Sequence, residues 1–344
     1  MSNTSINTKR ADVIRYISGL PTVLPTVTSG IVSPVGSLSN LSRTDQLDLN
    51  LSGTCVVGAS PAQFTAHLLA YHWVPIVANG KAALHCGGHA NTFDDDKSAP
   101  GSVTSGFGDW RMISSLLTAG FDVIGYYMPT YGPVYIGLKE SSWPNGPDGA
   151  GQSGHNWLIQ FAACPLRYFL GLPIACVNYL VSLGFTDITS IGLSGGGWSS
   201  TWLTALDTRI SRGYSVAGTQ PLYMRSDGSI GDVEQFSSDI YRIVNYLDLY
   251  CLAAQGRRHI QIYNRGNGST HLGDDICFGP RQYSTVGCGA RIQGLSYDQA
   301  IADMKAEIVA AMSGVGTFDI LLDQTADAHQ ITWWAAGQIV TDIG

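Results

Sequence analysis

Residues 187–202, DITSIGLSGGGWSSTW, place a single serine, Ser194, between a short apolar run and three consecutive glycines. A glycine in a helix costs about 1 kcal/mol relative to alanine, so another requirement must outweigh helix propensity here. Residues 192–196 read GLSGG and fit the pattern G-x-S-x-G, with a predicted strand before it and a predicted helix after it. In that context the serine occupies a strained turn that exposes its hydroxyl and tolerates only small neighbours. The stretch therefore predicts a nucleophilic serine at the end of a strand.

Eight histidines are candidates for the general base, which is needed because a serine hydroxyl is unreactive at neutral pH. In this strand–turn–helix context the partners follow the serine in the order acid, then histidine. His329 lies in QTADAHQIT, between the last predicted strand and the last predicted helix, at the same sheet edge as Ser194. We therefore assign His329 as the base. An ordinary imidazole has a pKa of about 6.5, so activity should fall below about pH 6.

A carboxylate must hold the imidazole in the reactive tautomer. It should follow the predicted strand HIQIY, where the loop NRGNGSTHLGDDICF offers Asp274 and Asp275. Asp274 is slightly favoured, and one of the two is expected to orient His329. Asp323, at the end of the predicted strand TFDILL, is the alternative acid.

An oxyanion hole is the third requirement, and each lost donor costs about 3–4 kcal/mol in comparable sites. The first predicted donor is the backbone N–H of Gly195, which follows the nucleophile. The others should come from the loop LHCGGHA, where Gly87 and Gly88 allow the backbone to approach a substrate closely. A plain glycine turn is the alternative interpretation of that loop.

Strands and helices alternate along most of the chain, which predicts a mostly parallel sheet flanked by helices. Residues 1–344 are expected to form one α/β domain on a single core. Residues 1–50 should be extended, and residues 130–156 and 220–255 should be cap-like insertions that shape a pocket. The predicted strands are residues 80–86, 121–129, 187–193, 213–217, 259–263 and 317–322, and the predicted helices are 109–119, 167–183, 198–206, 297–312 and 331–340.

The composition limits the classes of partner. The net charge is −7 and charged residues make up only 13%, which argues against a nucleic-acid partner because phosphate binding needs a basic face. No apolar run is long enough to cross a membrane, and the N-terminus lacks the apolar core of a signal peptide. We expect a soluble protein whose compartment is unknown, with the cytoplasm or, if the gene is viral, a virus particle as the alternatives. The seven scattered cysteines indicate buried free thiols rather than a disulfide framework or a zinc finger.

The segment GLSGGGW at residues 192–198, followed by ALDTRI at residues 205–210, resembles esterases of the acetyl xylan esterase and dienelactone hydrolase type. These belong to the α/β-hydrolase superfamily, and the resemblance covers roughly residue 55 to the C-terminus. It implies an α/β-hydrolase fold and a serine hydrolase that cleaves carboxylic esters without a cofactor or metal. An acylated carbohydrate or a small ester would be the substrate. By the same resemblance Ser194 is the nucleophile, His329 the base and Gly195 an oxyanion donor.

Two alternatives stay open. In the first, His85, His89 and the acidic run at residues 94–96 ligate a divalent ion in a metal-dependent hydrolase, although their spacing fits no familiar signature. In the second, a binding or virion-structural protein has kept a hydrolase fold without turnover, since fold does not prove function. Dinucleotide binding is excluded because SGGGWSS lacks the G-x-G-x-x-G spacing.

Overall fold

The structure is a computed structural model of the 344-residue chain. It describes residues 3–17, 19–57, 60–90, 92–94, 107–138, 152–225, 231–265, 291–312, 314–326 and 329–344.

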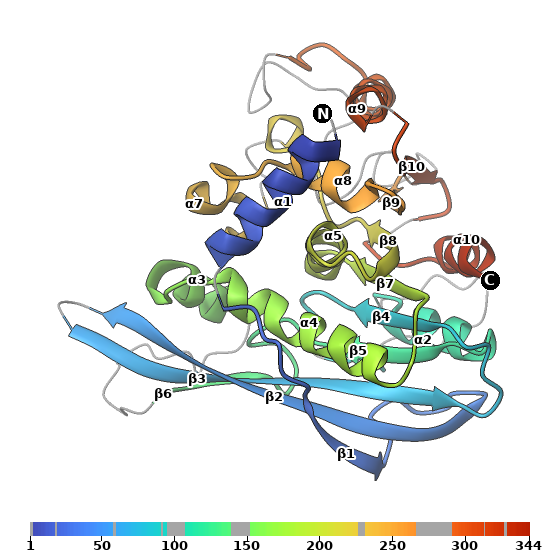
Figure 1. The fold of residues 1–344 in the computed structure, drawn as a ribbon. Helices are drawn as coiled ribbons and strands as arrows, with labels where there is room; N and C mark the ends of the chain where they lie inside the picture. The colour runs from blue at the N-terminus through green and yellow to red at the C-terminus, as the bar shows by residue number, and fades with distance from the viewer. Residues whose placement is uncertain are drawn as a thin grey trace.

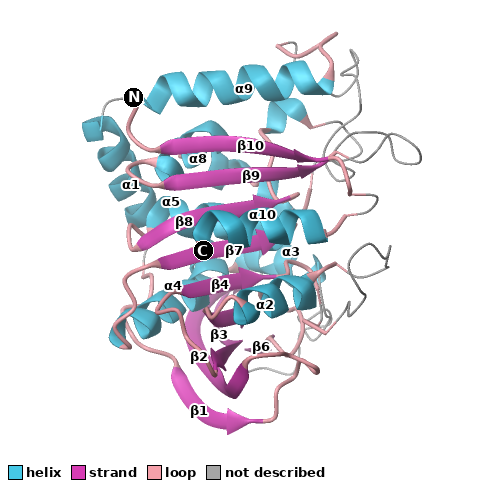
Figure 2. Cartoon of the chain, turned by 90° about the vertical axis from the view of Figure 1, so that its right-hand side faces the viewer, coloured by secondary structure: helices cyan, strands magenta, loops and turns pink. Residues whose placement is uncertain are grey.

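A ten-stranded sheet organises the described elements, in the order β1-β2-β3-β5-β4-β7-β8-β9-β10, with β6 paired to β3 (Figure 1). The six strands in the run β5-β4-β7-β8-β9-β10 are parallel to one another. Their carboxyl ends therefore share one edge of the sheet, as Figure 2 shows for β7 to β10. The predicted mostly parallel sheet is confirmed. The parallel strands are β4 (Ala82–Cys86), β5 (Asp122–Tyr126), β7 (Ile188–Leu193), β8 (Ile210–Val216), β9 (Arg258–Asn264) and β10 (Thr317–Asp323).

Helices cover both faces of the sheet (Figure 2). One face carries α2 (Asp109–Thr118) and α10 (Trp333–Ile343), which pack against each other. The other face carries α1 (Asn3–Ile17), α4 (Leu166–Ser182), α5 (Gly195–Leu206) and α8 (Tyr246–Ala254), and α9 (Tyr297–Met312) packs on α8 and β10. Within the described ranges, no helix combines the length and apolarity needed to cross a membrane.

Antiparallel strands extend the sheet beyond β5. Long strands β2 (Leu41–Val57) and β3 (Ser60–Pro75) pair along their whole length, and β1 (Thr26–Ile31) lies at the outer edge of β2. None of these three strands was predicted from the sequence. The region predicted as the first insertion contributes β6 (Tyr135–Leu138) and α3 (Gln152–Phe161), and the second contributes a 3-10 turn (Leu222–Met224), α6 (Val233–Phe236) and α7 (Ser238–Tyr241) before α8.

The N-terminal segment is extended only in part, because it begins with helix α1 and continues into strands β1 and β2. Ile6, Val13 and Ile17 are buried, and with Arg10 they follow helical spacing and form one face. The guanidinium of Arg10 donates 2.8 Å hydrogen bonds to the carbonyl oxygens of Ala205 and Leu252, near the ends of α5 and α8. These bonds fix α1 on α5 and α8. They also supply a donor to carbonyl groups in the last turns of α5 and α8, which have no partner within their own helix.

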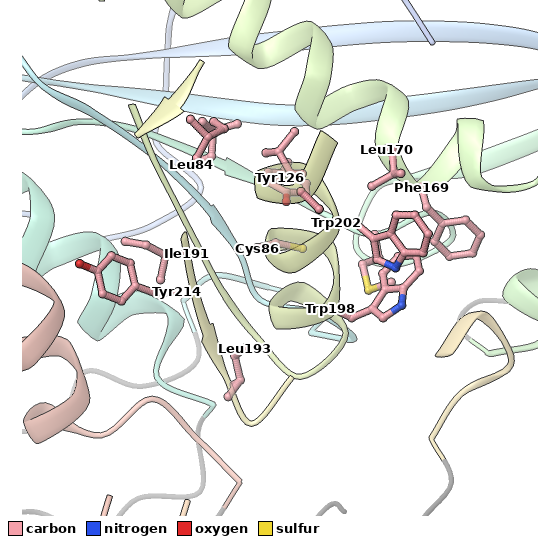
Figure 3. Close-up of a cluster of buried hydrophobic side chains, with 14 of the residues drawn as sticks. Leu84, Cys86, Tyr126, Phe169, Leu170, Ile191, Leu193, Trp198, Trp202 and Tyr214 are labelled. Atoms are coloured by element: carbon pink, nitrogen blue, oxygen red, sulfur yellow. The ribbon is translucent and has the colours of Figure 1, made fainter. Parts of the chain in front are cut away.

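The core between the sheet and helices α4 and α5 holds α5 in place (Figure 3). Trp198 and Trp202 lie one turn apart on α5, as predicted, and neither is exposed to solvent. Their ring centroids are 5.9 Å apart, and the ring of Phe169 on α4 meets Trp198 edge-on at 5.7 Å. The Trp198 indole also donates a 2.7 Å hydrogen bond to the Tyr241 hydroxyl. This packing fixes the helix that begins directly after Ser194.

Candidate active site

Ser194 joins strand β7 to helix α5 at the carboxyl edge of the sheet. Its backbone lies at φ 57° and ψ −125°, a conformation that costs a non-glycine residue about 1–3 kcal/mol. Two backbone hydrogen bonds of 3.0 Å hold it there, from the Ser194 N–H to Val216 and from the Trp198 N–H to the Ser194 carbonyl. The side chain is half-buried, and no described residue is hydrogen-bonded to its hydroxyl. The strained turn expected from the sequence is therefore present, with the hydroxyl available.

The glycines around Ser194 are required by close packing of backbone on backbone. A Cβ atom on Gly192 would lie 2.1 Å from the carbonyl oxygen of Gly196. A Cβ on Gly196 would lie 1.9 Å from the carbonyl oxygen of Cys86 at the end of β4. Any side chain at these positions would push α5 away from the strands. This explains why glycine stands here despite its low helix propensity.

The loop after β4 lies directly against this turn. Gly88 has φ 68°, and a Cβ on it would lie 2.5 Å from the Leu193 carbonyl oxygen and 2.9 Å from the Gly195 nitrogen. A Cβ on Gly87 would lie 2.5 Å from a carboxylate oxygen of Asp109. The structure thus brings the predicted oxyanion residues Gly88 and Gly195 together, whereas Gly87 packs on Asp109. Their assignment as oxyanion donors stays a prediction.

Replacing Gly88 with alanine should unfold the chain more readily and abolish activity, because the new methyl group meets backbone atoms that cannot move away. Gly256 is a matched control, since its φ of 67° is nearly the same and nothing lies within 4 Å of a Cβ there. Gly256→Ala should cost only the positive-φ strain of about 1–2 kcal/mol. Gly88→Ala should cost about 1–3 kcal/mol more, the typical cost of overpacking. Urea unfolding of both variants measures the difference, and equal losses would contradict the packing argument.

His85 supports the same loop and is not placed as a metal ligand. Its Nε2 lies 2.6 Å from a carboxylate oxygen of Asp109, and both side chains are fully buried. A carboxylate oxygen of Asp94 accepts a 3.4 Å hydrogen bond from the Gly36 N–H, and residues 95 and 96 lie outside the described ranges. In the part of the chain that the structure describes, His85, His89 and Asp94 form no common ligand cluster. The metal site suggested by the sequence is therefore not formed by His85, His89 and Asp94, and its other two acidic residues lie outside the described ranges.

His329 lies between β10 and α10, as predicted. The two residues after it are hydrogen-bonded to β9 and to the residue preceding Gly108 and α2. Asn264, the last residue of β9, donates a 3.0 Å hydrogen bond to the Gln330 carbonyl. The Ile331 N–H donates a 2.8 Å bond to the carbonyl of Phe107, just before α2. These two bonds hold the segment directly after His329 against the end of β9 and the start of α2.

Burial of the His329 ring changes the expected pH profile. Desolvation, together with the positive charge of His89, lowers the pKa of His329 to about 4. A base must be neutral, so kcat/KM should rise with pH through about pH 4 and be level above pH 5, which corrects the fall below pH 6 that an unshifted imidazole gives. Initial rates from pH 3.5 to 8, with circular dichroism at each pH to confirm folding, check this. A midpoint near pH 6.5 would contradict it.

The acid of the triad stays a prediction. Asp274 and Asp275 both lie outside the described residues. Asp323 is fully buried, and its carboxylate accepts hydrogen bonds from the Thr325 N–H at 2.8 Å and from the Thr332 hydroxyl. These bonds hold the two ends of the segment that carries His329, and Asp323 therefore helps to shape that segment.

A group of charged side chains beside the turn, two of them buried and two partly exposed, was not predicted from the sequence apart from His89. His89 packs on Gly195, because a Cβ on that glycine would lie 3.0 Å from His89 Cε1. Its Nδ1 lies 2.9 Å from a carboxylate oxygen of Asp232. Burial opposes a charge on His89, but the carboxylates of Asp232 and Glu234 outweigh it and raise its pKa to about 9. Burial likewise opposes a charge on Glu234, yet the charges of His155 and His89 lower the pKa of its carboxyl.

Comparison of the sequence with known protein families and with curated proteins finds no match. Solved structures show the same fold at low identity. Acetyl xylan esterase 1 from a Thermoanaerobacterium species is 13% identical with a TM-score of 0.51, covering 98% of this chain and 93% of its own. The acetyl xylan esterase from a Paenibacillus species is 12% identical with a TM-score of 0.52, covering 100% and 95%. A glucuronoyl esterase of carbohydrate esterase family 15 from Caldicellulosiruptor kristjansonii is 12% identical with a TM-score of 0.50, covering 99% and 84%.

These likenesses confirm the expected α/β-hydrolase fold. Its mostly parallel sheet lies between two layers of helices and places the turn at Ser194 after β7, near the middle of the sheet.

Proposed function

We propose that the chain is a serine hydrolase that cleaves carboxylic esters through an acyl-enzyme on Ser194. The observation that carries the proposal is the backbone of Ser194, a non-glycine residue at φ 57° between β7 and α5. Strain of this kind persists only where surrounding structure enforces it, and it clusters at functional sites. The close backbone packing of β7, α5, the end of β4 and the loop after β4 around residue 194 supplies that enforcement.

The proposed reaction has two steps. His329 accepts the proton of the Ser194 hydroxyl as the oxygen attacks the ester carbonyl, and the alcohol leaves from the tetrahedral intermediate after receiving that proton. Water then attacks the acyl-enzyme in the same way and releases the acid. The N–H of Gly195 and the loop at Gly88 would stabilise the oxyanion, helped by the positive end of helix α5. Asp274 or Asp275 would orient His329, and no cofactor is needed.

The proposed substrate is an acylated carbohydrate. The solved structures that share the fold include two acetyl xylan esterases and a glucuronoyl esterase, all of which act on carbohydrate esters by their names. A single domain with residues 130–156 and 220–255 as cap-like insertions would place the pocket over Ser194. A net charge of −7 with few charged residues suits a neutral sugar better than a polyanion.

A fluorophosphonate probe tests the mechanism directly, because it reacts only with an activated serine. Mass spectrometry of the digested adduct should locate the label on Ser194, and the protein should hydrolyse p-nitrophenyl acetate faster than the butyrate and octanoate esters. Release of acetate from acetylated xylan tests the substrate class. A folded protein with neither labelling nor ester hydrolysis would overturn the proposal and favour the non-catalytic binding or structural protein.

A further inference from the structure

Three side chains from separate segments meet beside the turn at Ser194. They are His89 from the loop after β4, His155 from α3 and Glu234 from α6, and their ligand atoms all lie within 4.8 Å of one another. His155 and Glu234 are fully buried or nearly so, and a fifth of the His89 side chain is exposed. The rings of Tyr131 and Phe169 pack on the two imidazoles. The cluster is thus a polar site flanked by aromatic side chains.

The hydrogen-bond partners of His155 fix which of its nitrogens carries a proton. Its Nε2 lies 2.8 Å from the carbonyl oxygen of Pro129. A carbonyl oxygen only accepts, so Nε2 carries the hydrogen and donates it. In the neutral ring, Nδ1 then presents a lone pair to a carboxylate oxygen of Glu234 at 3.2 Å. In that state two acceptors face each other, and a metal cation between them would remove the repulsion.

His89 repeats the pattern from the other side of the same carboxylate. Its Nδ1 lies 2.9 Å from Asp232, so that nitrogen carries the hydrogen, and Nε2 faces the second oxygen of Glu234 at 3.5 Å. Both His89 Nε2 and that oxygen are buried with no hydrogen-bond partner among the described residues. Without a metal, the two facing pairs are satisfied only by protons on His89 Nε2 and His155 Nδ1, whereas a single divalent ion would bind both nitrogens and the Glu234 carboxylate at once.

The donor set suits zinc. Two imidazole nitrogens and one carboxylate, with a fourth position open, form one of the established zinc ligand sets. Tetrahedral ligands at about 2.0–2.1 Å from zinc lie about 3.3 Å apart, close to the 3.2 Å and 3.5 Å separations found here. Metal-bound histidines usually donate their second ring N–H to a carboxylate or a backbone carbonyl, as His89 does to Asp232 and His155 does to Pro129.

We propose that His89, His155 and Glu234 bind one zinc ion, with Asp232 and the Pro129 carbonyl orienting the two imidazoles. The ion would join the loop after β4, α3 and α6 around Gly195. The site does not depend on the proposed ester hydrolysis, because Ser194 is not among its ligands.

Zinc titration of the full chain, followed by desalting and measurement of the metal content, tests the site. The parent protein and Ser194→Ala should each retain one zinc per chain, and zinc should raise the melting temperature in a way that a chelator reverses. Glu234→Gln and His155→Ala should bind at least tenfold more weakly, and Asp232→Asn should lose about 10–100-fold in affinity. His67→Gln is the matched control, since His67 stacks on Tyr135 and lies outside the cluster.

Two results would overturn the site. One is a folded parent that retains no zinc and shows no change in melting temperature with zinc, a measurement that does not depend on any variant folding. The other is a Glu234→Gln protein that binds zinc as tightly as the parent. If the parent binds zinc but hydrolyses no ester, the zinc site stands and the proposed function fails.

Discussion

Ser194→Ala is expected to lower kcat for p-nitrophenyl acetate by about 10⁴–10⁶-fold, the loss found when the nucleophile of a serine hydrolase is removed. The reason is that no acyl-enzyme can form, while substrate binding and the oxyanion donors remain. The fold should hold, because the Ser194 hydroxyl makes no hydrogen bond to any described residue. The loss should therefore appear in kcat, with little change in KM.

Ser200→Ala is the control for this experiment. Ser200 lies on the same helix α5, is fully buried, and its hydroxyl has no partner in the described part of the chain. Removing that hydroxyl should leave the rate within about twofold of the parent, since no buried hydrogen bond is lost. Activity retained in Ser194→Ala, or lost equally in both variants, would contradict Ser194 as the nucleophile.

His329→Gln is expected to lower kcat/KM by at least about 10³-fold, because glutamine keeps a polar side chain but cannot accept the serine proton. The acid limb of the pH profile should disappear from the residual activity, since the titrating base is gone. Labelling of Ser194 by a fluorophosphonate should slow in the same proportion. His67→Gln, on β3, should leave all three measurements unchanged.

A purely structural role for His329 would give a different result. The variant would then lose stability in a urea titration, and its residual rate would keep the pH dependence of the parent. That pattern would contradict His329 as the base and leave the base to be sought among the other histidines.

The parallel half of the sheet was predicted well because each element has a clear local pattern and end signal. Strand β7 and helix α9 show this, since their apolar spacing gave bounds close to those observed. The antiparallel half was missed although Leu47, Leu49 and Leu51 are buried at period-two spacing along β2. The Ser, Thr and Pro content of the first fifty residues was instead interpreted as an extended segment.

Site residues could be predicted only where a single continuous stretch of sequence determines the local backbone. Ser194 was identified because the strand, the turn and the helix are contiguous, and the glycine requirement is local. His89, His155 and Glu234 carry no such signal, because each lies in a different segment and no spacing connects them. Only the tertiary fold brings them together.

The long-range contacts of helix α1 also determine when α1 can pack in its native position during synthesis. Arg10 bonds to residues 195 and 242 positions further along the chain, so α1 cannot make both contacts until Leu252 has been synthesised. At about 5–20 residues per second, the wait on the ribosome is roughly 10–50 s. Throughout that time the apolar face of α1 is without its native packing partners, so a chaperone that binds exposed apolar helices could recognise the newly made α1 segment.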